Sequence, residues 1–339
     1  MSDARIPHGG NLHEAARRHG IPYDAWLDLS TGINPLGYPV PPVPADAWRR
    51  LPDDGDALAA CAARYYGAPD AAHVLPVAGS QAAIRALPAL LPAGDAGVAT
   101  LAYGEYAPAF ARHGHRVVPL DIGADVLPAT LRHVIIGNPN NPTADVVPAE
   151  RLLGWHAQLS ARGGTLIVDE AFADTGATPS LAQYADRAGL VVLRSVGKFF
   201  GLAGIRAGFV LGCPQHIAAL RDLLGAWTVS GPARHAVVAA FGDYAWQAAA
   251  RERLAAHGER LAALLRAHGF AVRATPLFSW TDDPRATALH AALAAHGIWT
   301  RHFPQPSSVR IGLPGSEAEW QRVIEALAQC VPTLQQQSA

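Results

Sequence analysis

Lysine is almost missing from this sequence. The 339 residues include 27 lysines and arginines together, and one of these, Lys198, is a lysine. A chain of this length would ordinarily contain on the order of twenty lysines. The single methionine and the abundant alanine fit a genome that prefers arginine codons. Arginine replaces lysine where only charge is needed, but its guanidinium stays protonated and cannot act as an amine nucleophile. Lys198 is therefore the first candidate catalytic residue.

The net charge is also small, and long apolar runs are missing from the sequence. A net charge of -1 and a pI near 6.9 give no electrostatic footprint for nucleic acid or an anionic membrane, so we expect neither as a partner. No apolar run approaches the roughly 18 residues of a membrane span. Residues 1–10 lack a basic head followed by an apolar stretch, so no secretion signal is predicted. We therefore expect a soluble, cytoplasmic protein.

Cysteines are few and histidines are scattered. Cys61, Cys213 and Cys330 are odd in number and far apart, so neither a disulfide framework nor a zinc site is predicted. His113 and His115 have no acidic or cysteine neighbour in the sequence, and we expect no metal. Half of the residues are hydrophobic while 16% are charged, against roughly 25% in ordinary globular chains. This excess indicates a large core or an oligomer interface.

The length suggests about two domains, and the sequence divides into three parts. Residues 1–45 are rich in glycine and proline but contain Trp26 and Leu29, which indicates an ordered arm that contributes to a small domain and to the substrate site. Residues 46–230 are expected to form the large domain. Residues 231–339 begin with a long helical pattern to about residue 268 and continue as strand, helix, strand, helix. They predict a smaller C-terminal α+β domain.

The central part alternates helical stretches with short apolar runs. The helical stretches are residues 56–66, 81–91 and 149–161, and the apolar runs are residues 134–136, 166–168, 190–193 and 209–211. Short runs of this kind separated by helices are typical of buried strands in a parallel sheet. The fold class is therefore predicted as α/β, with a mainly parallel central sheet covered by helices.

Polar residues directly follow three of these runs. The three segments are Gly137-Asn138-Pro139-Asn140-Asn141-Pro142-Thr143, Asp169-Glu170-Ala171-Phe172, and Arg194-Ser195-Val196-Gly197-Lys198 with Arg206 eight residues later. In open α/β sheets, ligands bind beyond the carboxyl ends of the strands. Each segment alone is weak evidence for a functional site, because Asn-Pro repeats mark turns and a carboxylate after a strand often caps a helix. Ser195-x-x-Lys198 also matches the acylating serine motif of penicillin-binding proteins, but no second lysine supplies its Lys-Thr-Gly partner.

Together and in this order, the segments resemble the fold-type I pyridoxal-phosphate enzymes of the aspartate aminotransferase superfamily, over essentially the whole chain. The resemblance implies that Lys198 forms a Schiff base with pyridoxal 5'-phosphate. It implies that Asp169 pairs with the pyridine nitrogen and that Asn141 donates to the phenolate oxygen. The remaining cofactor contacts that it implies are Tyr103 stacked on the ring, and Ser80, Gln81, Ser195 and Arg206 around the phosphate.

The N-terminal motifs narrow the resemblance. His8-Gly9-Gly10-Asn11 and Ser30 to Gly37 resemble the threonine-phosphate decarboxylases of cobalamin biosynthesis, which are close to histidinol-phosphate aminotransferase. Those enzymes convert L-threonine O-3-phosphate to (R)-1-amino-2-propanol O-2-phosphate, and their fold is normally a homodimer. The resemblance implies a substrate site made of His8, Gly9, Asn141, Arg301 and Arg310, with Arg310 on the carboxylate.

Two residues depart from the family pattern. Phe172 stands three residues after Asp169, where many members have tyrosine, and core packing is its simplest interpretation. Gly32 stands where some members have asparagine. The alternatives are a histidinol-phosphate or related phospho-amino-acid aminotransferase, and a pyridoxal-phosphate-binding regulator or scaffold. A regulator would place a basic winged-helix domain ahead of the fold, whereas here the substrate arm begins by His8. The same residues serve decarboxylation and transamination, so the orientation of the substrate selects the reaction.

Overall fold

The computed structural model describes residues 6, 8–176 and 178–337, and the chain forms two compact units. The large unit comprises residues 37–141 and 145–249, and the small unit takes the described residues up to 36, residues 142–144, and those from 250 onward. These boundaries differ from the expected ones after residues 45 and 230. Helices α2 (Ala45–Arg49) and α3 (Leu58–Tyr66) pack against α8 (Gly231–Gly242), so both flanking segments belong to the large unit.

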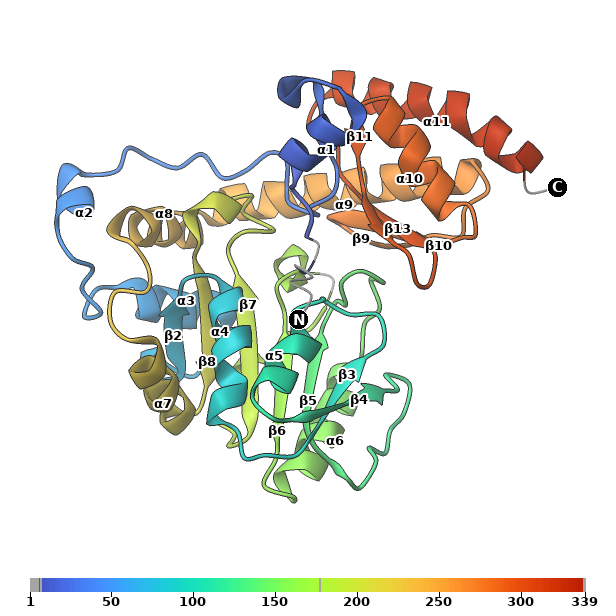
Figure 1. The fold of residues 1–339 in the computed structure, drawn as a ribbon. Helices are drawn as coiled ribbons and strands as arrows, with labels where there is room; N and C mark the ends of the chain where they lie inside the picture. The colour runs from blue at the N-terminus through green and yellow to red at the C-terminus, as the bar shows by residue number, and fades with distance from the viewer. Residues whose placement is uncertain (1–5, 7, 177, 338–339) are drawn as a thin grey trace. The chain divides into compact units, whose positions relative to one another are not determined.

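A seven-stranded sheet lies at the centre of the large unit, in the part of the chain that the structure describes (Figure 1). The strands are β2 (Val74–Val77), β3 (Asp95–Ala99), β4 (Arg116–Leu120), β5 (Leu131–Gly137), β6 (Thr165–Asp169), β7 (Leu190–Ser195) and β8 (Gly208–Gly212). Their order is β2-β8-β7-β6-β5-β3-β4, and every pair from β7 to β4 is parallel. Strand β8 runs antiparallel to both of its neighbours. The predicted mainly parallel sheet is confirmed.

Helices cover this sheet. Besides α2, α3 and α8, the large unit contains α4 (Ser80–Ala86), α5 (Tyr106–Arg112), α6 (Ala149–Ser160) and α7 (Pro214–Leu224). Short 3-10 helices lie at Ala71–His73, Leu87–Leu90, Ala173–Thr175, Ala182–Tyr184 and Ala203–Ile205. Apolar side chains of the central strands, including Ile135, Ile167, Val191 and Leu193, form one core cluster with residues of α4, α5 and α7. Alternate strand residues therefore face this helical layer.

Three strands of the large unit and one helix break were not predicted. Strand β2 contains Pro76 and lies at the sheet edge, where a missing backbone donor is tolerated. Strands β3 and β4 lack a run of β-branched residues, so only their neighbours in the sheet define them. The expected long helix after residue 231 is two helices, α8 and α9 (Tyr244–Ala267), because Asp243 interrupts it. The Asp243 carboxylate accepts a hydrogen bond from the Trp246 backbone N–H at 3.0 Å, which caps α9.

The small unit has two sheets with helices beside them. Antiparallel strands β12 (Arg301–Phe303), β13 (Ser308–Gly312), β10 (Phe278–Asp282) and β9 (Arg273–Thr275) form one sheet in this order. Strands β1 (Leu27–Asp28) and β11 (Ile298–Trp299) form a parallel pair. The other elements are α1 (Leu12–His19), the 3-10 helix Tyr23–Ala25, α10 (Ala286–Ala295), α11 (Glu317–Gln337) and the end of α9.

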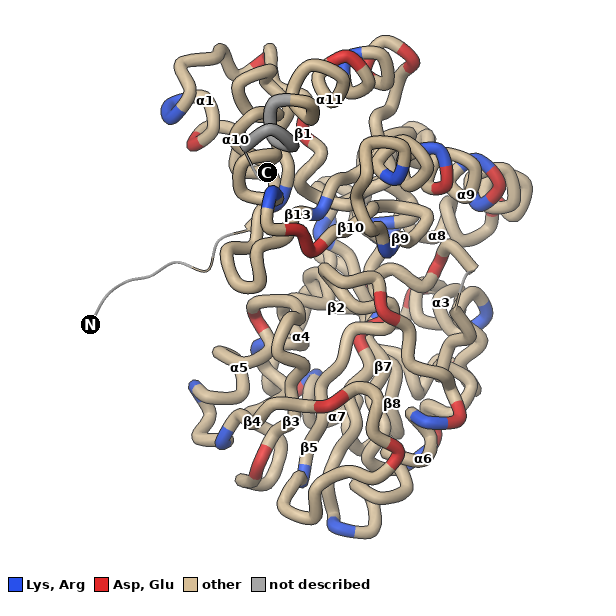
Figure 2. Tube along the Cα trace, turned by 90° about the vertical axis from the view of Figure 1, so that its right-hand side faces the viewer, with Lys and Arg blue, Asp and Glu red and all other residues tan. Residues whose placement is uncertain are grey.

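The distribution of charge, the character of the helices and the grouping of metal-binding side chains are relevant to what the protein can bind. Figure 2 shows basic and acidic residues interspersed along the chain in both units. Within the described residues, none of the helices combines the length and the apolar character needed to cross a membrane. Among the same residues, no three histidine, cysteine or acidic side chains are grouped so that they could hold a metal ion.

Candidate active site

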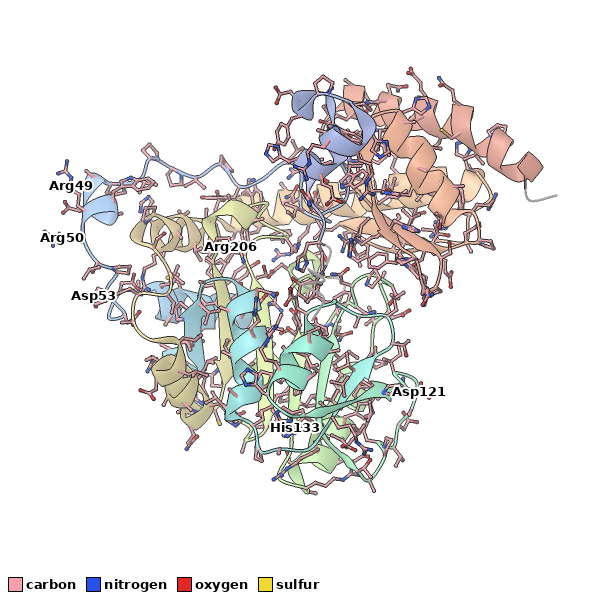
Figure 3. All side chains as sticks on the ribbon, viewed as in Figure 1. Arg49, Arg50, Asp53, Asp121, His133 and Arg206 are labelled. Carbon is pink, nitrogen blue, oxygen red and sulfur yellow. The ribbon has the colours of Figure 1, made fainter. Side chains whose placement is uncertain are left out.

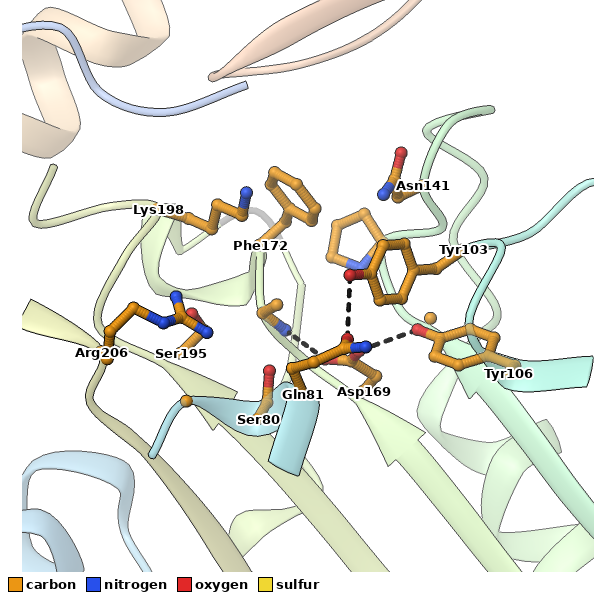
Figure 4. A pocket seen from close by; sticks show the side chains of 14 residues that line it. Ser80, Gln81, Tyr103, Tyr106, Asn141, Asp169, Phe172, Ser195, Lys198 and Arg206 are labelled. Atoms are coloured by element: carbon orange, nitrogen blue, oxygen red, sulfur yellow. Dashed lines mark hydrogen bonds between the residues drawn. The ribbon is translucent and has the colours of Figure 1, made fainter. Parts of the chain in front are cut away.

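A pocket opens at the edge of the large sheet where the parallel strands end. The register places Gly137 beside Asp169 and Asp169 beside Leu193, so the ends of β5, β6 and β7 lie side by side. Strands β2 and β3 end at the same edge, and β8 begins there. The pocket is lined by Gly79, Ser80, Gln81, Tyr103, Tyr106, Gly137, Pro139, Asn141, Asp169, Ala171, Phe172, Ser195, Lys198 and Arg206 (Figure 4). Every residue that the sequence predicts to contact the cofactor lines this pocket.

Lys198 follows β7 and extends into the pocket toward the ring of Phe172 (Figure 4). Its Nζ lies 5.4 Å from the centre of that ring. The Gly201 backbone N–H donates to the Lys198 carbonyl oxygen at 3.2 Å, which closes the turn that presents the side chain. Phe172 is buried as expected, but it forms part of the pocket wall instead of serving only the core. The sole lysine of the sequence therefore has its amine where a ligand of this pocket would lie.

Asp169 supplies a buried carboxylate to the pocket. The Tyr106 hydroxyl donates to its Oδ2 at 2.8 Å, and the Ala171 backbone N–H donates to its Oδ1 at 3.1 Å. Burial raises the pKa of Asp169 above its ordinary value, while the two hydrogen bonds and the charge of Lys198 act in the opposite direction. A cationic ring nitrogen in the pocket would favour the ionised form of this carboxylate.

One corner of the pocket gathers cationic and hydroxyl groups. It holds the Arg206 guanidinium and the hydroxyls of Ser80 and Ser195 (Figure 4). Gly79 has a φ of 76°, and a Cβ there would stand 2.7 Å from Arg206 Nη2. A Cβ on Gly208 would stand 2.5 Å from the Ser80 backbone nitrogen. Both glycines keep this corner open, and its donors are of the kind that bind phosphate.

The opposite side of the pocket carries Tyr103 and Asn141 (Figure 4). The Tyr103 hydroxyl donates to Gln81 Oε1 at 2.9 Å, so the Gln81 side chain orients this ring. The loop that presents Asn141 is fixed by Asn138, which donates to the Val147 carbonyl at 3.1 Å and accepts from the Val147 N–H at 2.9 Å. These hydrogen bonds hold the Tyr103 ring and the loop of Asn141 on one side of the pocket.

The residues present fit pyridoxal phosphate. The pocket offers a primary amine at Lys198, a buried carboxylate at Asp169, a ring at Tyr103 and a cationic corner at Arg206. These groups match the aldehyde, the ring nitrogen, the ring face and the phosphate of that cofactor in turn. The glycines at 79 and 208 leave room for the phosphate, which a side chain at either position would reduce.

The small unit joins the N-terminal arm to Arg310. A Cβ on Gly9 would stand 2.4 Å from the Ser30 carbonyl oxygen, so only glycine permits this approach. The Gly10 N–H donates to Ser30 Oγ at 2.7 Å, and Ser30 Oγ donates to Asp28 Oδ1 at 2.6 Å. Arg310 Nη2 donates to the same Ser30 carbonyl at 2.5 Å. Two of the predicted substrate residues, Gly9 and Arg310, therefore meet at Ser30.

Arg301 and Arg310 are direct cross-strand partners in the β12–β13 pair, so both project from one face of the small sheet. Burial lowers the pKa of Arg301, and Arg310 is buried as well. Like charges opposite each other are destabilising, and an anion between them would remove the repulsion. His8 is exposed at the start of the arm. Gly32 has a φ of 61°, a conformation that glycine and asparagine adopt more readily than other residues.

Comparison with known proteins shows the family of this chain. Residues 51–327 match the family described as aminotransferase class I and II. The chain belongs to this family. It is 50% identical over 326 residues to a threonine-phosphate decarboxylase of Pseudomonas aeruginosa, covering 95% of this chain and 97% of that protein. A threonine-phosphate decarboxylase of a Sinorhizobium species is 42% identical over 334 residues, covering 96% and 98%.

A solved structure has the same fold as this aminotransferase class I and II family member. The histidinol-phosphate aminotransferase of Sinorhizobium meliloti, in complex with pyridoxal-5'-phosphate, matches with a TM-score of 0.79 at 22% identity. The match covers 99% of this chain and 96% of that one. This likeness confirms the predicted fold-type I architecture.

The sequence alone gave no role to Tyr106, which lines this pocket, or to Gly208, which lies beside it. Tyr106 was not assigned a role, because its partner Asp169 is 63 residues away in the chain. The role of Gly208 depends on another segment, because a Cβ there would stand 2.5 Å from the Ser80 backbone nitrogen. The one available signal was position, since Gly208 opens β8 two residues after Arg206.

Proposed function

We propose that this protein is a pyridoxal-phosphate-dependent threonine-phosphate decarboxylase, which forms (R)-1-amino-2-propanol O-2-phosphate from L-threonine O-3-phosphate in cobalamin biosynthesis. The main support is the near full-length similarity to two proteins of that name, together with a pocket that fits the cofactor. The similarity extends beyond the family match at residues 51–327 to 95% of the chain.

Each pocket residue has a distinct task in this reaction. Bound pyridoxal phosphate supplies an electron sink for the electron pair that carbon dioxide leaves on the substrate Cα. Lys198 would hold the cofactor through its side-chain amine, and in its protonated ammonium form it would deliver a proton to the substrate Cα. Asp169 keeps the ring nitrogen protonated through its negative charge. Arg206 and Ser195 would hold the cofactor phosphate through their side chains, and Ser80 and Gln81 would hold it through their backbone N–H groups.

The small unit supplies the groups for the substrate. Threonine phosphate carries a carboxylate and a phosphate, and the face shared by Arg301 and Arg310 offers two guanidinium groups. We assign Arg310 to the carboxylate and Arg301 to the substrate phosphate, with His8 and Gly9 as further small-unit contacts. Asn141, in the large unit, is assigned a separate substrate contact. The two arginines orient the substrate so that its carboxylate leaves, whereas another orientation would lead to transamination.

Carbon dioxide release tests the proposed function. Purified protein loaded with pyridoxal phosphate is incubated with threonine phosphate alone, and in parallel with histidinol phosphate. Continuous release of carbon dioxide from threonine phosphate without a keto-acid acceptor is expected. A single half-turnover that resumes only when a keto acid is added would instead identify an aminotransferase. Binding of the cofactor without turnover of either substrate would identify a scaffold or regulator.

We also propose that the protein is a homodimer, through an exposed apolar surface on the large unit. Trp48, Leu51 and Trp227 are 69%, 67% and 56% exposed, and they line one groove with Val40. Figure 1 shows that the segment with α2 stands out from the sheet, and Figure 3 shows Arg49 and Arg50 at its outer side. Trp227 has a φ of 61°, which is rare for a bulky residue and suggests a conformation that a partner stabilises. Light scattering should give twice the chain mass, and Trp48→Arg should give a monomer.

The cytoplasm is the proposed location. Cys61, Cys213 and Cys330 are free thiols in the structure, which suits a reducing compartment. Fractionation of cells that express the protein should recover it with cytoplasmic markers, and recovery with extracytoplasmic markers would contradict this.

A further inference from the structure

A buried ion cluster lies beside the cofactor pocket. Arg194 Nη1 donates to Glu170 Oε2 at 2.5 Å, and Arg194 Nη2 donates to Asp174 Oδ1 at 2.7 Å. The Arg194 side chain is 5% exposed, and each carboxylate side chain is 1% exposed. Burying three charged groups is costly unless their geometry is specific, and here two carboxylates face one guanidinium. The Tyr66 ring covers the guanidinium, with its centre 4.4 Å from the Arg194 Cζ.

Arg194 itself does not line the pocket. It precedes Ser195 in β7, and successive strand side chains point to opposite faces of the sheet. Ser195 faces the pocket, so the Arg194 side chain lies on the other face of the sheet. Both of its partners come from the segment that begins directly after Asp169. The two ion pairs connect Arg194 to that segment.

The cluster fixes this segment at several points. Glu170 accepts from the Leu181 backbone N–H at 2.8 Å and from the Ser180 hydroxyl at 2.5 Å, which holds the far end of the loop. Asp174 holds the middle of the same loop through its ion pair with Arg194. Phe172, whose ring faces the amine of Lys198, lies between the two carboxylates in the chain.

The cluster also acts through charge. The negative charge of Glu170 contributes to the raised pKa of Asp169, although burial is the larger cause. Arg194 is the cation that offsets this charge, and Asp174 and Glu170 raise the pKa of Arg194 above its ordinary value in spite of burial. The guanidinium therefore stays charged at any working pH.

We propose that Arg194 is a positioning residue of the active site: its two ion pairs hold Phe172 in place against Lys198 and offset the charge of Glu170 beside Asp169. Arg194 touches neither cofactor nor substrate in this role. The inference rests on the proposed attachment of the cofactor to Lys198, and it does not depend on which substrate is used.

The chain offers a matched control in Arg234. Its side chain is also 5% exposed, and it binds Asp56 at 2.7 Å and Asp54 at 3.3 Å. It donates to the Asp53 carbonyl at 2.8 Å as well. Neither Arg234 nor these partners line the cofactor pocket. Arg234→Lys thus reports what loss of a buried arginine fork outside the cofactor pocket does to the protein.

The test compares Arg194→Lys with Arg234→Lys in the protein loaded with pyridoxal phosphate. Lysine keeps the charge but cannot bind two carboxylates with one planar fork, so both variants should melt at lower temperature. Only Arg194→Lys should shift the pH midpoint of the bound cofactor's visible absorbance and weaken cofactor binding, by about tenfold. If both variants lower the melting temperature equally and leave the absorbance titration and the cofactor Kd unchanged, Arg194 is only structural.

If Arg194→Lys fails to fold, Glu170→Gln tests the same proposal. The amide keeps the shape of the side chain and leaves one carboxylate for one guanidinium. Removing a negative charge beside Asp169 destabilises a nearby cation, so the absorbance midpoint should move to lower pH. An unchanged midpoint in this folded variant overturns the proposal. Borohydride reduction and peptide mapping of the wild-type protein test the attachment separately, because a label away from Lys198 refutes the assigned site and not the role of Arg194 in the fold.

Discussion

The two units place their functional groups by different means. In the large unit, Asp169, Ser195 and Lys198 each follow a strand, and neighbouring parallel strands bring them to one pocket. In the small unit, Gly9 and Arg310 meet only through Ser30, which is 280 residues from Arg310 in the chain. Cofactor chemistry thus depends on local strand ends, whereas the groups assigned to the substrate depend on contacts between distant segments.

This difference predicts separable consequences for mutations. A change in the large-unit pocket should alter the spectrum and affinity of the cofactor, because its residues are those that fit pyridoxal phosphate. A change at Gly9, Arg301 or Arg310 should alter the KM for the substrate while the cofactor spectrum stays the same. A variant in one unit that produced the other unit's effect would break the comparison.

The largest effect is expected for Lys198→Ala. No other lysine exists in the sequence, so the visible absorbance of lysine-bound cofactor and the release of carbon dioxide should both disappear. Lys198→Arg is the matched control, because it keeps a positive charge but supplies no reactive amine. Absorbance spectra and the carbon dioxide assay measure both variants. A normal absorbance band in either one would refute the assignment of this lysine.

Arg310→Ala should have the next largest effect. Removing one partner of a buried charge-assisted contact costs about 2–5 kcal/mol, so kcat/KM for threonine phosphate should fall about 30- to 5,000-fold. The cofactor spectrum and Kd should stay as in the wild type. Arg310→Lys should recover only part of the loss, because lysine lacks the planar fork that matches a carboxylate. A loss of cofactor with unchanged KM would contradict the division between the units.

The same division explains how much of the site was predictable. The α/β sheet and Lys198, Asp169 and Arg206 could be predicted because each motif adjoins an apolar run in the sequence. Strand β3, by contrast, contains alanine and glycine and is a strand because β4 and β5 pair with it. Tyr106 could not be assigned, since its hydrogen bond to Asp169 arises only in the folded sheet.

The domain boundaries could not be predicted for a related reason. The proline-rich segment after residue 37 looks like a continuation of the arm in the sequence. In the structure it belongs to the large unit, where α2 contacts α8. Contacts between distant helices leave no local signal, so composition alone placed the boundary at residue 45.

Asp169→Asn should make the cofactor-free protein more stable and weaken its binding of the cofactor. Burial raises the pKa of Asp169, so the folded protein without cofactor holds this proton more tightly than the unfolded chain does. Its stability should therefore fall as pH rises from the ordinary aspartate pKa through the raised one. The asparagine variant lacks this loss and should be more stable at neutral pH, yet bind the cofactor roughly 10- to 100-fold more weakly.

Melting curves against pH and cofactor titrations measure the two effects of Asp169→Asn. Asp95→Asn is the control of opposite sign, because the hydrogen bond from Arg116 lowers the pKa of Asp95. Its stability contribution is present above the ordinary aspartate pKa, so this variant should be less stable at neutral pH. Equal changes in both variants would show that burial of Asp169 is not the cause.

Gly9→Ala should have the smallest effect and tests the small unit most finely. The added Cβ would lie 2.4 Å from the Ser30 carbonyl oxygen, so the arm must move away from the group that Arg310 also contacts. We expect KM for threonine phosphate to rise about fivefold, near 1 kcal/mol, with an unchanged cofactor spectrum. Gly20→Ala is the control, because a Cβ there meets nothing within 4 Å but the φ of 68° is unfavourable for alanine. It should lower the melting temperature without changing KM. A KM increase in both variants would trace the effect to instability of the small unit, whereas an increase in Gly9→Ala alone assigns it to the position of the arm.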